Sequence, residues 1–148
     1  MTGRPARRPR RRRRRRHAPW AGLVASAVLL AGCTPAGGPD PGLVATVGDA
    51  LSAARSAQLG VQQDERSLLL PTTASVVYQD MAEELADAAR QLELADAATA
   101  IDSRYRQDAL EATRAALEGV HAAEHGRLAD ASHALTGASD ALARLEKQ

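Results

Sequence analysis

The stretch that decides the fold is Tyr78-Gln-Asp-Met-Ala-Glu-Glu-Leu-Ala-Asp-Ala-Ala-Arg-Gln-Leu-Glu-Leu-Ala95. One set of apolar residues recurs in it at alternating steps of three and four, and the charged residues fall between them. The members of this set are Tyr78, Met81, Leu85, Ala88, Leu92 and Ala95. Such spacing places all of them on one face of an α-helix, as in the a and d positions of a heptad. We therefore predict an amphipathic helix after Pro71, with Thr72 or Thr73 as its N-cap.

The preceding segment also has a helical period, from Leu43 onward. Its apolar positions step by three and four and are Val44, Val47, Leu51, Ala54 and Val61, with Gln58 at one position of the same face. We predict a helix that stops or weakens at Gly60, because glycine is common at helix ends. The segment 61–70 is either a helical extension or a packed loop.

Two further stripes follow toward the carboxyl terminus. The first, expected in a helix that begins at Asp102 or Ser103, consists of Tyr105, Ala109, Ala112, Ala116, Val120 and Ala123. The second consists of Leu128, Ala131, Leu135, Ala138, Leu142 and Leu145. The apolar phase slips between the two, at His125 and Gly126. A tight turn between two helices is the simplest explanation, and one long helix with a stutter is the alternative.

Composition agrees with an all-α protein. The chain has no Phe and two Tyr, whereas strands favour aromatic and β-branched residues. Short connections place successive helices side by side and antiparallel. We therefore predict an antiparallel four-helix up-down bundle, rich in Ala and Leu, over residues 43–148. Because Ala buries little surface, completion of a thin core by dimerisation is a second possibility.

The amino-terminal part has a different composition. Ten of the 19 Lys and Arg residues lie in residues 4–16, followed by an apolar run from Trp20 to Ala31. A cationic segment before 7–15 apolar residues is typical of a secretory signal peptide. The run ends in Leu30-Ala31-Gly32-Cys33, which contains the only Cys of the chain.

Leu30-Ala31-Gly32-Cys33 resembles the lipobox of bacterial lipoproteins. The resemblance covers residues 1–33 and implies that residues 1–32 are a signal peptide that is removed. It further implies a diacylglyceryl group on the Cys33 thiol and an acyl chain such as palmitate on its amine. An uncleaved membrane anchor, an incidental buried thiol and a nucleic-acid-binding Arg run are the alternatives.

The region after the lipobox is expected to be a lipid-anchored spacer over residues 33–42, because it is rich in Pro and Gly. It would reach at most about 30 Å from the bilayer. The excess of Arg over Lys and the abundant Ala suggest a GC-rich genome, and hence a high-GC Gram-positive source. The expected location is then the outer face of the cytoplasmic membrane.

The charge of the chain from Cys33 to Gln148 argues against nucleic-acid binding. All 18 Asp and Glu lie from Asp40 onward, against nine Lys and Arg, which gives 9 − 18 = −9. Proteins that bind nucleic acid instead carry clustered positive charge.

One group of residues could bind a metal: Glu118, His121 and His125 share a helix face. Glu118-x-x-His121 resembles half of a di-iron site, but the chain has no second Glu-x-x-His pair, and His133 is the only other His after the lipobox. Exposed histidines near a helix end explain the pattern more simply, so no cofactor is predicted. Tyr78 and Tyr105 are expected to pack in the core. Arg104, Arg106 and Arg114 are expected to form exposed ion pairs, such as Arg114 with Glu111, and the alternative is that they pair with acidic residues across the bundle.

No phosphate-binding loop or nucleophile motif occurs in the chain. We therefore expect no enzyme, but a structural or protein-interaction module of the cell envelope. Its partner would be an envelope protein, the cell wall or a second copy of the chain. The alternative function is binding of a metal or a small solute by the helix that carries His121 and His125.

Overall fold

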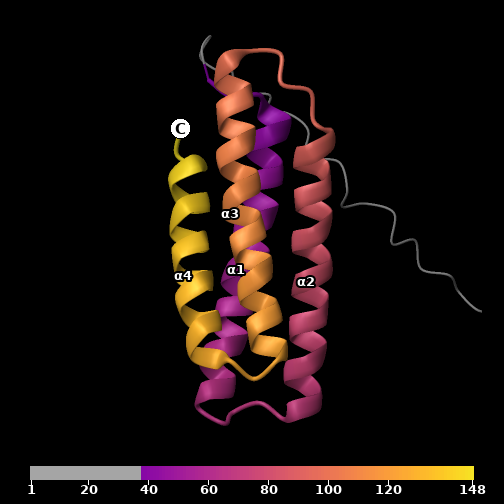
Figure 1. Ribbon diagram of the computed structural model, residues 1–148, viewed down its shortest axis with the longest axis vertical. Helices are drawn as coiled ribbons and strands as arrows, with labels where there is room; N and C mark the ends of the chain where they lie inside the picture. Colours follow the sequence, from indigo (N-terminus) through magenta and orange to yellow (C-terminus); the bar gives the residue numbers. More distant parts are fainter. Residues whose placement is uncertain (1–37) are drawn as a thin grey trace, which may run out of the picture. The chain divides into compact units, whose positions relative to one another are not determined.

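The computed structural model describes residues 38–148, which form four helices and no strand (Figure 1). The helices are α1 (Pro41–Glu65), α2 (Pro71–Leu94), α3 (Ala100–Glu124) and α4 (Leu128–Leu145). The prediction of an all-α four-helix bundle is confirmed. The predicted signal peptide, the lipobox and the first half of the predicted spacer lie outside the described residues.

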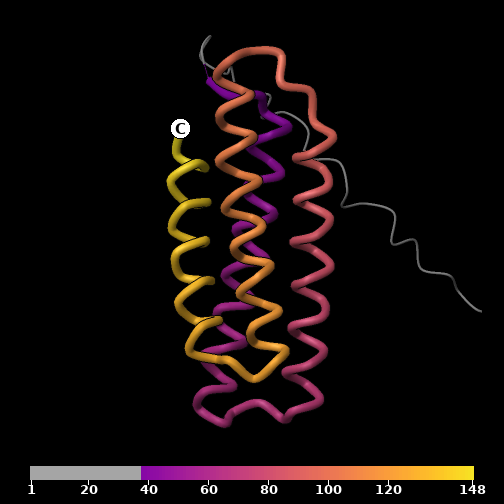
Figure 2. Tube along the Cα trace, viewed as in Figure 1, coloured from indigo at the N-terminus to yellow at the C-terminus, as the bar shows by residue number. Residues whose placement is uncertain are grey.

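Successive helices run in opposite directions along the bundle, as the chain trace shows (Figure 2). Hydrogen bonds at the helix ends agree with this course. The Asp40 amide donates to Asp102 Oδ1 at 2.9 Å, which joins the starts of α1 and α3. The Tyr105 hydroxyl donates to the Leu145 carbonyl at 3.4 Å, which joins the end of α4 to the start of α3. We call this the N-terminal end of the bundle, and the end with the α1–α2 and α3–α4 connections the distal end.

The core is built from the predicted stripes. In α2, Tyr78, Leu85, Ala88 and Leu92 are buried, and Met81 is half-buried at the edge. All six residues of the predicted α3 stripe are buried, and so are the last five of the α4 stripe: Ala131, Leu135, Ala138, Leu142 and Leu145. The four helices of one chain therefore cover one another's apolar faces. Among residues 38–148, the buried apolar side chains all lie between Leu43 and Leu145.

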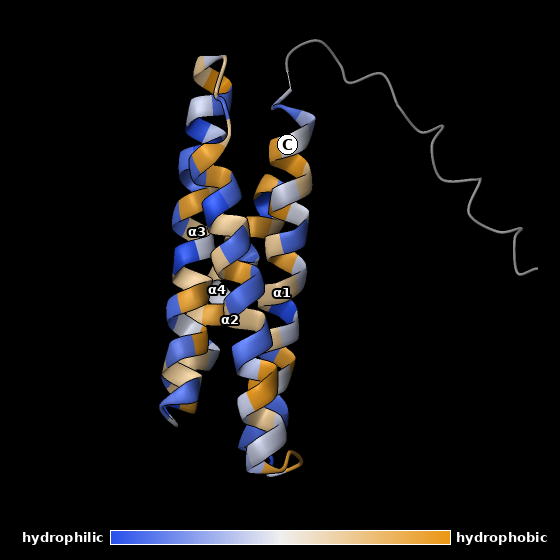
Figure 3. Ribbon diagram, turned by 90° about the vertical axis from the view of Figure 1, so that its right-hand side faces the viewer, coloured by the Kyte–Doolittle hydropathy of each residue, from blue (hydrophilic) through white to orange (hydrophobic). Residues whose placement is uncertain are grey.

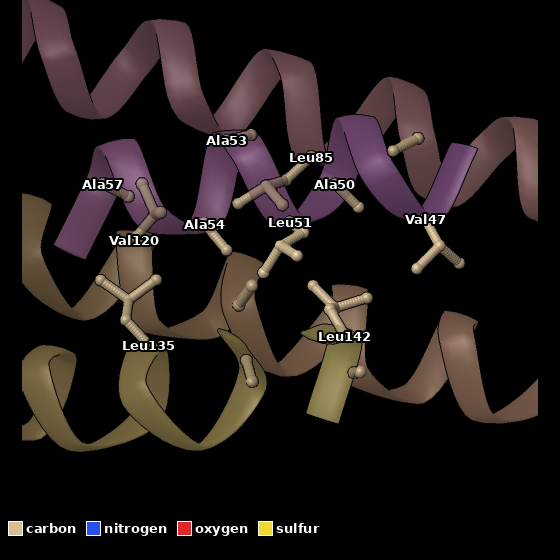
Figure 4. Packing of buried hydrophobic residues seen from close by; sticks show 14 of the residues in the cluster. Val47, Ala50, Leu51, Ala53, Ala54, Ala57, Leu85, Val120, Leu135 and Leu142 are labelled. Carbon is tan, nitrogen blue, oxygen red and sulfur yellow. The ribbon is translucent and has the colours of Figure 1, made fainter. Parts of the chain in front are cut away.

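Small side chains set the distances between the helices. Residues of α1 and α3 approach within 8 Å across the diagonal of the bundle, where α1 presents Ala50, Ala54 and Ala57 (Figure 4). Leu51, Leu85, Val120, Leu135 and Leu142 fill the remaining interior. Gly119 of α3 lies so close to α4 that a Cβ added there would be 2.9 Å from Leu135 Cγ. The close packing of the helices therefore compensates for the small surface that each Ala buries.

Helix α1 differs from the prediction at both ends. It begins at Pro41, two residues before Leu43 and inside the predicted spacer, because Asp40 is its N-cap. Asp40 Oδ1 accepts from the Gly42 amide at 2.8 Å, and Pro41 is favoured in the first turn. The expected stop at Gly60 is wrong. The helix continues to Glu65, and the buried Gly60 instead makes room for Val77 of α2.

The starts of α2 and α3 also correct the prediction. Neither Thr72 nor Thr73 caps α2, because the helix already begins at Pro71 and Leu70 is its N-cap without a side-chain hydrogen bond. Helix α3 begins at Ala100, before the predicted Asp102 or Ser103. Its N-cap is Thr99, whose hydroxyl accepts from the Asp102 amide at 3.0 Å, while Asp102 Oδ2 accepts from the Thr99 amide at 3.1 Å. This is a capping box.

The predicted turn between α3 and α4 is confirmed. Gly126 has a φ of 73°, in the left-handed region, and its amide donates to the Ala123 carbonyl at 2.8 Å. The Arg127 amide donates to the Ala122 carbonyl at 2.9 Å. These bonds form a Schellman motif that ends α3, so the alternative of one long helix is wrong.

Candidate contact surface at the distal end

The connection between α1 and α2 contains the only non-glycine residue with positive φ among residues 38–148. This residue is Ser67, with a φ of 55°. The Ser67 amide donates to the Asp64 carbonyl at 2.8 Å and the Leu68 amide to the Gln63 carbonyl at 2.9 Å, which again forms a Schellman motif. Glycine is the usual residue at this position, because a Cβ in the left-handed region is sterically unfavourable. The connection therefore holds local backbone strain.

This connection carries exposed leucines. Leu68 and Leu70 are 69% and 71% exposed, whereas Leu69 between them packs against the core. In a Schellman motif a hydrophobic residue at the position of Leu68 often contacts the last turns of the preceding helix, whereas Leu68 is exposed. The hydropathy-coloured ribbon shows the connection as an apolar tip below α1 and α2 (Figure 3). We call Leu68 and Leu70 the leucine knob.

A shallow pocket of about 370 Å³ adjoins the leucine knob at Pro71. Its walls come from α1, α2 and the end of α3, and its lining residues are Asp64, Pro71, Ala74, Ser75, Tyr78, Ala123, Glu124 and Gly126. The buried Tyr78 hydroxyl donates to Asp64 Oδ2 at 3.0 Å. Burial raises the pKa of Tyr78, and the hydrogen bond to Asp64 raises it further. The hydroxyl therefore stays protonated and holds the first residues of α2 against the end of α1.

The predicted metal ligands lie at this end but do not form a closed site. Glu118, His121 and His125 are all exposed, and His121 Nδ1 lies 2.9 Å from Glu124 Oε2 of its own helix. His133 lines a different hollow, together with Glu65 of α1. No three His, Cys, Asp or Glu side chains within residues 38–148 are placed to hold a metal ion. A metal would therefore have two ligands on one helix face and solvent for the rest.

The remaining candidate side chains have structural surroundings. Tyr105, like Tyr78, is buried in the core as predicted, and burial raises its pKa. The predicted pair of Arg114 with Glu111 is wrong, and the alternative, a pair with an acidic residue of another helix, is correct for Arg114. Arg114 Nη2 instead lies 2.6 Å from Glu93 Oε1 on α2, because the α2–α3 interface brings these exposed side chains together. Exposed pairs of this kind contribute little to stability.

The lipidation residue Cys33 and the cleavage motif Leu30, Ala31 and Gly32 lie outside the described residues. Among the helices that the structure describes, none combines the length and apolar composition needed to cross a membrane. No protein family, curated protein or solved structure matches this chain.

The leucine knob was not predicted as a functional feature. The sequence signal was three consecutive leucines directly before Pro71, in a segment that was expected to be a helical extension or a packed loop. Only the structure distinguishes the packed Leu69 from its two exposed neighbours.

Proposed function

We propose that this chain is a bacterial lipoprotein, anchored through Cys33 to the outer face of the cytoplasmic membrane. Its helical domain acts by contact with an envelope protein and has no catalytic role. The observation that carries the proposal is the leucine knob, which is exposed on a strained connection at the end opposite to the start of α1.

The bundle geometry suits presentation of a contact surface away from an anchor. Helix α1 has 25 residues and therefore spans about 37 Å from its N-cap to the distal end. Residues 34–40 add at most about 23 Å between Cys33 and the helix. The leucine knob can thus reach partners well beyond the lipid headgroups. Exposed apolar residues that are grouped in one place, rather than scattered singly, mark interaction sites.

The alternative function, loose binding of a metal or small solute by His121 and His125, has weaker support. Within the described residues, its only support is the exposed pair that His121 forms with Glu124 of the same helix. Two imidazoles four residues apart chelate a divalent ion weakly, and tight binding needs three or four converging ligands.

The anchor is tested with Cys33→Ser and cell fractionation. We expect the wild-type protein to enter the detergent phase and to begin at a Cys33 that carries a lipid mass. The Cys33→Ser protein should be unprocessed or released. An unmodified wild-type protein that stays in the aqueous phase would contradict the anchor.

The contact surface is tested with a photoreactive residue at Leu70 and, as a matched control, at Leu59 of α1. Leu59 is 56% exposed and lies within α1, about two turns before the helix ends at Glu65, so it is exposed like Leu70 but is not part of the connection. Irradiation of intact cells should give a discrete adduct from position 70 and none from position 59. Amine-directed crosslinkers are unsuitable because Lys147 is the only Lys. Equal yields at both positions would argue against a contact role of the knob.

A further inference from the structure

A second apolar surface lies at the N-terminal end of the bundle, on the connection between α2 and α3. Leu94 and Ile101, which flank this connection, are 79% and 54% exposed. Ala98 and Ala100 between them are exposed as well, and Asp96 is the only charged residue of the segment. We call residues 94–101 the α2–α3 connection. Its two largest side chains, Leu94 and Ile101, are thus both in contact with water.

The chain that leads to the predicted anchor enters the bundle beside this connection. The Asp40 amide donates to Asp102 Oδ1, at the residue that follows Ile101. Asp102 Oδ2 in turn accepts from the amide and the hydroxyl of Thr99, at 3.1 and 2.7 Å. Asp102 therefore links the last residue before α1 to the α2–α3 connection. These hydrogen bonds hold the end of the spacer, at Asp40, in a fixed position relative to the exposed apolar residues of the α2–α3 connection.

The spacer is too short to carry this end of the bundle far from a lipid on Cys33. Seven residues, 34–40, lie between Cys33 and α1, and they span at most about 23 Å when fully extended. Ordinary chain conformations are shorter than this limit. With a lipid on Cys33, the surface nearest to Asp40 would therefore stay within about 23 Å of the headgroups of the anchoring membrane.

We propose that the α2–α3 connection rests on the membrane that holds the lipid of Cys33, with Ile101 inserted in the interfacial region. This inference depends on the proposed function, because it needs an anchor at Cys33. A lipid surface is favoured over a protein partner because the spacer length keeps this end at the bilayer, whereas the leucine knob is at the opposite end. The bundle would then stand upright and point the knob away from the membrane.

The charged residues at this end indicate that the contact with the membrane is apolar rather than electrostatic. Arg104 is exposed, but Arg106 is occupied, since its Nη1 donates to the Ala95 carbonyl at 2.7 Å. Arg144 and Lys147, at the end of α4, are also exposed at this end, whereas Asp40, Asp96 and Glu146 bring negative charge to it. Because these charges offset one another, anionic lipids should not strengthen the contact, and added salt should change it little.

The test uses the chain from Cys33 to Gln148, which contains the whole described core. Cys33 is its only thiol and can be coupled to a maleimide phospholipid in phosphatidylcholine vesicles, so the result is independent of lipidation in cells. The segment has no Trp, so a single Trp is introduced as Ile101→Trp or, as the control, as Leu70→Trp. The two positions are both exposed and lie at opposite ends. Circular dichroism of each variant verifies the fold.

In coupled vesicles, Trp emission at position 101 should shift to shorter wavelength. Phospholipids brominated in the acyl chain should quench it at least about twofold more than at position 70. Addition of phosphatidylglycerol or salt should leave this difference unchanged. Equal quenching at both positions, strong or absent, would overturn the proposed orientation. Absence of a lipid mass on the protein from cells would instead overturn the anchor, which the separate Cys33 experiment measures.

Discussion

Gly119 offers a quantitative test of the close packing between α3 and α4. In a solvent-exposed helix interior, Gly→Ala stabilises a protein by about 1 kcal/mol, because Ala has the higher helix propensity. Gly137 of α4 is such a position, since an added Cβ would meet no atom within 4 Å. At Gly119 the same Cβ would lie 2.9 Å from Leu135 Cγ and 3.3 Å from Ala134 Cβ.

The packing cost at Gly119 exceeds the gain in helix propensity. Carbon atoms in contact prefer about 3.5–4.0 Å, and Leu135 is completely buried, with its Cγ near the backbone rather than at a flexible end. Forcing one methyl group into such a core costs about 1–3 kcal/mol. We expect Gly119→Ala to destabilise the bundle by about 1 kcal/mol, and thus to be about 2 kcal/mol less stable than Gly137→Ala.

Thermal and urea unfolding of the chain from Cys33 onward, followed by circular dichroism, measure this difference. For a domain of this size, about 2 kcal/mol corresponds to a difference in Tm of about 8 °C. Gly60→Ala should fall between the two variants, because its Cβ would lie 3.1 Å from Val77 Cγ1, at the movable end of a half-buried side chain. If Gly119→Ala is as stable as Gly137→Ala, α3 and α4 do not approach as closely as described.

Three further outcomes test the core, the N-terminal capping network and the histidines. Leu85→Asp should lower the free energy of unfolding by at least about 3 kcal/mol, because it leaves an unpaired charge in a fully buried position. The control Glu83→Gln changes an exposed residue and should have little effect. Equally small effects of both changes in urea unfolding would place the α2 stripe outside the core. The hydrogen bond from the Thr99 hydroxyl, and next those from the Asp40 and Thr99 amides, hold the pKa of Asp102 below its usual value. The ionised Asp102 therefore stabilises the fold at any pH above its pKa in the unfolded chain, and this stabilisation is lost as the pH falls through its lower pKa in the folded protein. The Tm of the wild type should therefore fall more steeply than that of Asp102→Asn below about pH 4, and parallel curves would show that this carboxylate is not linked to folding. Calorimetric titration with zinc should give a Kd of about 1 μM or weaker. A stoichiometric site with a nanomolar Kd that His121→Ala abolishes would make metal binding the better-supported function.

Much of the bundle could be predicted because an amphipathic helix is a local pattern. The spacing of Leu85 and Leu92, for instance, requires one apolar face in any tertiary context. The helix starts were missed where several polar residues could serve as a cap. Thr99 and Asp102 are both good N-terminal residues, and only their reciprocal hydrogen bonds distinguish the N-cap from the third helical position.

By itself the sequence determined four amphipathic helices, an acidic domain and a lipobox-like segment, because each depends on residues close together in the chain. Tertiary structure alone decided which helix faces meet and in what register, since these depend on contacts between residues far apart. The close fit of Gly119 against Leu135 sets the register of α3 and α4. Packing of α2 against α3 directs Arg114 to Glu93. The tertiary structure also packs Leu69 against the core and leaves Leu68 and Leu70 in solvent, which no periodicity in so short a segment could show.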